Sequence, residues 1–132
     1  MATSGIPSLD SAFSPVVMAA ADEATRQFYE RHPEAGDRYG ERGRAYATHD
    51  HAYVVAWIQS AVDLDAPDTL RRNLRWLHDL LGARSFPRDW FLESLDIVAA
   101  VMLERGMLAE MDAARMVRPV LAEIVETADG QR

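Results

Sequence analysis

Cysteine and lysine are both missing from the 132-residue sequence. The absence of cysteine excludes disulfides, thiolate metal sites, cysteine nucleophiles and a thioether link to a cofactor. The chain also lacks an apolar run of the roughly 18–20 residues needed to span a bilayer, and it does not begin with a basic segment followed by an apolar block. We therefore expect a cytoplasmic protein with no membrane partner, and we attribute the exclusive use of arginine to coding bias.

Positive charge is scarce as well. The chain has 21 acidic and 14 basic residues and a net charge of −7, which opposes binding to nucleic acid because phosphate neutralisation needs a concentrated basic surface. The nearest basic cluster is formed by Arg71, Arg72 and Arg75, and three arginines on one helix face are typical of a solvated surface. We expect no nucleic-acid partner.

The clearest helix signal lies over residues 67–82. Leu70, Leu74, Leu77 and Leu81 follow the i, i+4, i+7, i+11 spacing of a core-facing helix. Asp65 is the expected N-cap of this helix, and Gly82 can end it in a left-handed conformation. A helix with so wide an apolar face must pack against at least two others.

Similar patterns predict further helices, and no strand pair stands out. The sequence therefore predicts an all-α, single-domain bundle of five to six helices. Its expected parts are a flexible arm over residues 1–13, a helical domain over 14–128 and a tail over 129–132. Within the domain, helices are expected over 14–31, 48–64, 87–105 and 107–128, with a short helix or turn over 34–47.

Several residues mark where these helices should begin and end. The expected N-caps are Ser14, Ser85, and either Thr48 or Asp50. Gly106 should end the helix expected over 87–105. His32, just before a proline, is expected to act as a cation at a helix C-terminus. Pro119 should kink or break the last helix.

Histidines are the first candidates for chemistry. His49 and His51 are two residues apart, which places them on opposite faces of a continuous helix. Only if the helix began at Asp50 or His51 could residues 49–51 form a surface triplet with metal-ligand character; otherwise capping and surface hydrogen bonding are expected. His78 borders the leucine stripe and either faces a pocket between helices or is a structural residue.

Aromatic residues at helical spacing suggest a cavity for a flat ligand. The candidate pocket residues are His51, Tyr53, Trp57, Trp76, His78 and Phe91. The same spacing is also typical of core residues. Trp76 lies off the leucine stripe, so it meets a further helix, faces a cavity or sits in a subunit interface. No catalytic motif is present, so we expect no catalytic residues. The sequence does not identify a metal.

Two stretches resemble a known family. Residues 28–34, FYERHPE, are similar to a segment in the early helices of bacterial globins, and residues 77–91, LHDLLGARSFPRDWF, are similar to the globin segment that runs on from the proximal helix. Leu80 or Leu81 stands where a proximal histidine would be. The resemblance therefore implies the non-haem, globin-like sensor domains of bacterial stress regulators. A weaker similarity is to the helical bundles that precede cobalamin-binding domains.

These observations favour a non-enzymatic sensory or regulatory helical module. It would act through protein–protein contacts or a small ligand between helices, as a homodimer and with a regulatory protein as a further partner. An alternative is a tetrapyrrole-binding protein for haem, a bilin or cobalamin, with His78 and then His51 as the contact. A third is a small enzyme with an interhelical active site.

Overall fold

The computed structural model describes residues 13–130 and their side chains through residue 126. This part of the chain is mostly helical and contains no strand, which confirms the predicted all-α bundle. The predicted arm lies outside it except for Phe13. The elements are α1 (Pro15–Arg31), α2 (Pro33–Leu64), α3 (Pro67–Ala83), α4 (Arg88–Glu104), α5 (Glu110–Asp112), a π-helical turn η1 (Ala113–Val117) and α6 (Arg118–Gly130). None of the helices in this range combines the length and apolarity that a membrane crossing needs.

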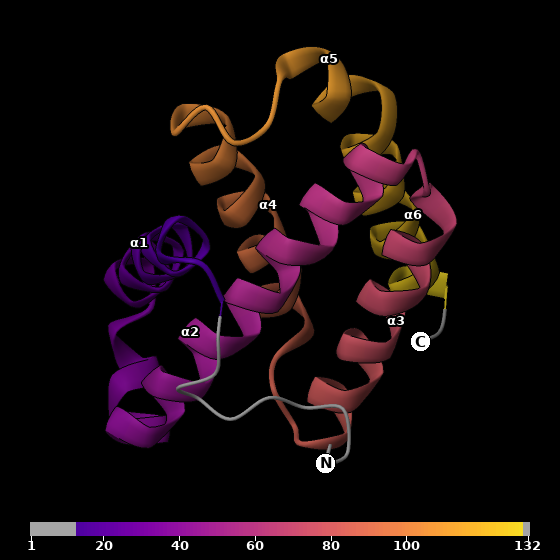
Figure 1. Cartoon of the computed structure of the whole chain (residues 1–132). Coiled ribbons are helices and arrows are strands. Elements are labelled where there is room, and N and C mark those ends of the chain that lie inside the picture. Colours follow the sequence, from indigo (N-terminus) through magenta and orange to yellow (C-terminus); the bar gives the residue numbers. More distant parts are fainter. Residues whose placement is uncertain (1–12, 131–132) are drawn as a thin grey trace, which may run out of the picture.

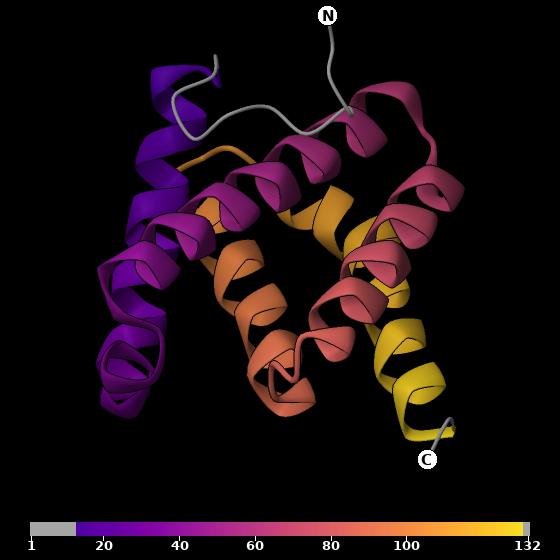
Figure 2. The same ribbon diagram turned by 90° about the horizontal axis from the view of Figure 1, so that it is seen from below.

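The long helix α2 runs diagonally across one face of the molecule (Figure 1). It packs against α1, α3 and α4, and α6 packs in turn against α3 and α4. Viewed from below, α1, α4 and α6 lie one after another behind it (Figure 2). The helix that the sequence marks as central to the fold, α3, therefore has α2 on one side and α6 on the other.

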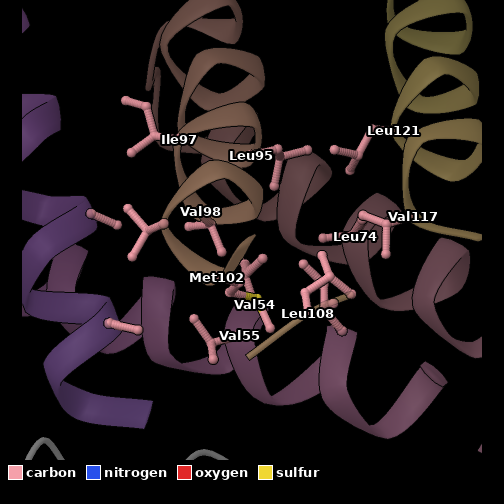
Figure 3. Close-up of a cluster of buried hydrophobic side chains, with 14 of the residues drawn as sticks. Val54, Val55, Leu74, Leu95, Ile97, Val98, Met102, Leu108, Val117 and Leu121 are labelled. Atoms are coloured by element: carbon pink, nitrogen blue, oxygen red, sulfur yellow. The ribbon is translucent and has the colours of Figure 1, made fainter. Parts of the chain in front are cut away.

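The core lies where four helices and the α4–α5 connection meet. Figure 3 shows Val54 and Val55 of α2 close to Met102 of α4, with Leu74 of α3 and Val117 of η1 beside them. All five side chains are buried. The predicted leucine stripe is confirmed for its first three members, and its fourth is partly buried against the same cluster.

Helix α1 forms as the sequence predicts. The Val17 N–H donates to the Ser14 hydroxyl at 3.2 Å, and a proline fills the first helical position. His32 ends the helix, and its Nε2 lies 2.8 Å from a carboxylate oxygen of Glu93 on α4. The hydrogen bond with His32 lowers the pKa of Glu93. The expected helix-terminal histidine therefore also ties α1 to α4.

The prediction for residues 34–64 was only partly right. A short helix does cover 33–39, and Gly40, with φ 68° and ψ −168°, makes a kink. The next segment, however, is already helical from Glu41, so Thr48 and Asp50 lie inside α2 and cap nothing. The Thr48 hydroxyl instead donates to the Arg44 carbonyl at 3.2 Å. Gly43 did not interrupt the helix, because a glycine costs only about 1 kcal/mol there and packing against α1 outweighs it.

Three left-handed residues, Asp65, Ser85 and Gly106, follow the C-termini of α2, α3 and α4. Each lies next to a tight backbone hydrogen bond that closes the helix end. The prediction for Gly106 is confirmed. Those for Asp65 and Ser85 as N-caps, and for Gly82 as the left-handed residue, are wrong, because α3 runs through Gly82 and the chain turns three residues later than glycine placement suggests.

The last helix starts later and is less regular than predicted. It begins at Glu110, passes through η1 and continues to Gly130, so two residues of the predicted tail are helical. Pro119 cannot donate a backbone hydrogen bond, and its ring would crowd the carbonyl of Arg115 in a regular helix. The wider π turn over 113–117 relieves this, as expected for a proline-associated irregularity. Met111 of α5 is largely exposed.

We predict that Gly40→Ala destabilises the protein by about 1–2 kcal/mol, because an L-residue pays this cost in a left-handed conformation. A Cβ at position 40 would meet nothing within 4 Å, so strain of the backbone is the only cost. Urea denaturation followed by circular dichroism measures the change.

Gly36→Ala is the matched control, because position 36 is equally open but helical. It should be neutral or stabilising by about 0.5–1 kcal/mol. Equal effects of the two substitutions would show that the kink does not depend on a glycine.

Candidate functional site

A pocket of about 210 Å³ lies between the first four helices. Its buried floor includes Phe28 of α1, His51 of α2 and Phe91 of α4. Its partly buried walls include Tyr39 and Phe86, and its exposed rim is formed by Tyr46 and Arg84. We call this cavity the interhelical pocket. Aromatic walls around a few polar groups are typical of sites for small molecules.

The kinked helix α2 supplies one whole side of the interhelical pocket. Residues 39, 43, 47, 50 and 54 line it, and their spacing of four, four, three and four residues is that of one helix face. The kink at Gly40 does not break this series, since Tyr39 still reaches the cavity. Tyr39 also packs against Phe86, with ring centroids 5.9 Å apart.

His51 is held in one tautomer by Thr25. The Thr25 hydroxyl donates to the Ala21 carbonyl at 2.9 Å, and its oxygen lies 2.8 Å from His51 Nδ1. A hydroxyl has only one hydrogen to give, so Nδ1 carries the imidazole proton and donates to Thr25. Burial lowers the pKa of His51 to about 4. At neutral pH the ring is uncharged, and its Nε2 has a free lone pair.

Asp50 is the second polar group of the interhelical pocket. Burial raises the pKa of its carboxyl to about 6, although the positive charge of Arg84 acts in the opposite direction. Desolvation therefore outweighs the arginine. None of the residues that the structure describes makes a hydrogen bond or ion pair with this carboxylate. At neutral pH it is an ionised, partly buried acceptor without a partner.

Tyr39 adds a third unsatisfied group. Its hydroxyl is buried and has no hydrogen-bond partner within the described part of the chain. A buried polar atom without a partner costs about 1–3 kcal/mol. The Asp50 carboxylate and His51 Nε2 line the same cavity and accept from no described residue, so three groups around it can bond to a ligand.

Three of the candidate residues named from the sequence lie elsewhere. Tyr53 and Trp57 lie on a different face of α2 from the interhelical pocket, and Trp76 of α3 continues their aromatic row. The ring centroids are 5.5 Å apart between Tyr53 and Trp57 and 6.5 Å apart between Trp57 and Trp76. Phe13 and His49 extend the row at its other end. Trp76 is 49% exposed at the end of the row.

His78 also lies outside the residues that line the interhelical pocket. Its Nδ1 is 3.1 Å from a carboxylate oxygen of Asp79, and its ring meets the edge of Phe91 at a centroid distance of 5.7 Å. Of the six candidates, the structure therefore brings only His51 and Phe91 together in one cavity. His49 and His51 lie on different faces of a continuous helix, and no three potential ligands gather into a metal site between residues 13 and 130.

Sequence reasoning missed Tyr39, Asp50 and Arg84 as pocket residues. The signal for the first two was present in the helical spacing of residues 39, 43, 47, 50 and 54. It was overlooked because the glycines of 34–47 suggested a turn there. Arg84 follows the end of α3, and its approach to the cavity depends on the tertiary fold alone.

Comparisons of this chain with family models, with curated proteins and with solved structures find no match. The resemblance to globin-like sensors therefore stays an expectation from the sequence. The site must be interpreted from its own residues.

We predict that Asp50→Asn changes how stability depends on pH. The carboxyl titrates at about 6 in the folded protein and near its ordinary 3.8 when unfolded, so its ionisation destabilises the fold above pH 6, by up to about 3 kcal/mol. The variant should therefore gain stability relative to wild type at pH 7, and this gain should disappear as the pH falls from 6 to 4.

Protonation of His51 changes the stability in the opposite direction over nearly the same pH range. Its folded pKa of about 4 lies below its ordinary 6.5, so its contribution to stability is complete above pH 6.5 and is lost as the pH falls to 4. Asp50→Asn should consequently lose stability on acidification more steeply than wild type. Urea denaturation between pH 4.5 and 7.5 measures the stability of wild type and of Asp50→Asn across this range. Asp63→Asn, exposed on the same helix, is the control, and parallel curves for Asp50→Asn and wild type would refute the prediction.

Proposed function

We propose that this chain is a non-enzymatic sensory or regulatory module that binds a small, flat ligand in the interhelical pocket. The observation that carries the proposal is an aromatic cavity lined by the buried, unpartnered hydroxyl of Tyr39 and by two acceptors, His51 Nε2 and the Asp50 carboxylate, to which no described residue donates a hydrogen bond. The cavity touches α1, α2, α3 and α4, so an occupant contacts all four helices at once. A change of occupancy can then change how they pack, which is the action expected of a sensor.

The size of the pocket supports a ligand of one or two rings. A buried cavity of about 150 Å³ accommodates benzene, and this one holds about 210 Å³. A tetrapyrrole has four rings and would need the helices to move apart. The small-ligand proposal therefore has better support than the tetrapyrrole alternative, in which His78 would be the first contact, since His78 is outside the lining residues.

We predict that Ala47→Trp abolishes ligand binding by filling the pocket. Ala47 is a small, partly buried residue of the lining. In a saturation-transfer NMR screen of one- and two-ring compounds, hits for the wild type should bind the variant about tenfold more weakly or worse. The same hits should raise the melting temperature of wild type, because they bind only the folded state.

Ala45→Trp, at an exposed position of the same helix outside the lining, is the matched control and should bind as wild type does. Hits that bind Ala47→Trp as well as wild type would place the site elsewhere. A screen without hits would remove the support for a ligand-binding module.

The homodimer belongs to this proposal as well. Trp76 remains 49% exposed although it packs edge-on against Trp57, and exposed tryptophans are enriched where proteins associate. We predict a dimer in size-exclusion chromatography with light scattering, and Trp76→Ala should raise its dissociation constant about tenfold or more. Met111→Ala, at a still more exposed apolar residue on α5, should leave it unchanged. A wild-type monomer at high concentration would contradict the homodimer.

A further inference from the structure

We infer that the interhelical pocket selects a planar organic cation whose ring carries N–H donors, such as an aromatic amidine or an amino-substituted nitrogen heterocycle, held by the Asp50 carboxylate and His51 Nε2. This inference rests on the proposed function and names the chemical class of its ligand. It follows from which hydrogen-bonding groups in the cavity are donors and which are acceptors.

The two polar groups of α2 are both acceptors at neutral pH. The only N–H of the neutral His51 ring is at Nδ1 and donates to the Thr25 oxygen, so Nε2 offers a lone pair. Asp50, which directly precedes His51 on the helix, offers an ionised carboxylate without a partner in the described chain. Buried acceptors are satisfied by donors, and a ligand with N–H groups on neighbouring atoms supplies two of them. The Tyr39 hydroxyl can accept a third or donate in return.

The aromatic lining favours a flat cation over a neutral ring. Phe28, Phe91 and Phe86 offer ring faces or edges to the cavity, and cations bind over ring faces. Two other rings of the lining, those of Tyr29 and Tyr39, already contact cations. The Arg44 guanidinium, a flat cation itself, lies 4.8 Å from the centre of the Tyr29 ring, and Arg38 lies 5.1 Å from that of Tyr39.

Arg84 is the group that argues for an anion instead. It is exposed at the rim, where water screens its charge, whereas Asp50 lies deeper. Burial raises the pKa of the Asp50 carboxyl more than the positive charge of Arg84 lowers it. An anionic ligand would also have to approach Asp50 and leave the lone pair of His51 without a donor. The inner groups therefore decide the charge of the ligand.

Three probes of nearly identical shape test this inference, namely benzamidine, benzamide and benzoate. They are a cation, a neutral amide and an anion on the same ring. Calorimetry or ligand-observed NMR at pH 7.5 should give benzamidine the highest affinity and benzoate the lowest. Asp50→Asn should weaken benzamidine about 10- to 100-fold, as expected for the loss of a charge-assisted hydrogen bond, and should hardly affect benzamide. Asp63→Asn is the control and should bind all three as wild type does.

The pH dependence gives a second readout. The other titratable or charged groups around the cavity are Tyr29, Tyr39, Tyr46, His51 and Arg84, and α4 contributes only the uncharged Ser94. Between pH 7.5 and 5 the group that changes charge is Asp50. Benzamidine should therefore bind about fivefold or more weakly at pH 5 than at pH 7.5, while Asp50→Asn should show no such change.

The affinities of the three probes and the Ala47→Trp variant together distinguish a wrong ligand class from a pocket that binds no ligand. Benzoate or benzamide binding better than benzamidine, with Ala47→Trp abolishing it, would overturn the cation while keeping the pocket as a binding site. Equal affinity of wild type and Asp50→Asn for benzamidine would also overturn the role of the carboxylate. If neither these probes nor a wider set of one- and two-ring compounds bind, both proposals fall.

Discussion

The close approach of α1 to α2 is the constraint on which the rest of the structure depends. Three alanines of α1, Ala20, Ala21 and Ala24, are completely buried, and side chains this small let two helices lie near the short end of the usual interaxial distances. At that separation the Thr25 hydroxyl reaches His51 across the interface at 2.8 Å. A larger residue in the alanine series would separate the helices, break this hydrogen bond and leave a buried imidazole N–H unsatisfied.

The same interface explains why the pocket exists. Small residues pack the first part of α1 tightly against α2, but the last turns carry the bulky rings of Phe28 and Tyr29. The pocket lies beside these rings. The wide side chains of α3 and α4, among them Leu77 and Phe91, close this space from the remaining sides.

The sequence was sufficient for the number and type of the helices and for most of the core. Periodic apolar residues and the Ser14–Pro15 start predicted α1 and α4 within a residue or two. It was insufficient where several weak signals compete. Gly36, Gly40 and Gly43 look alike in the sequence, yet only Gly40 leaves the helical conformation. Which glycine becomes the kink is decided by how residues 33–39 pack, and that contact is absent from any local pattern.

The candidate site was less predictable than the fold for the same reason. His51 and Phe91 could be chosen because their types suit a pocket, but Tyr53 and Trp57 suit one equally well and lie in the aromatic row. Only the direction in which each helix faces separates the two groups. Arg84 lies at the end of a helix and Tyr39 lies beside a kink. Local sequence patterns predict the structure least well at such irregular positions.

The kink at Gly40 separates two parts of α2 that contribute differently to the core and to the cavity. The segment after it carries the core residues Val54, Val55 and Ile58, whereas the segment before it contributes the tyrosine that walls the cavity. The two parts meet at one residue whose missing side chain touches nothing. A change at Tyr39 therefore alters one wall of the cavity from a segment that contributes a single residue, Ala35, to the apolar core.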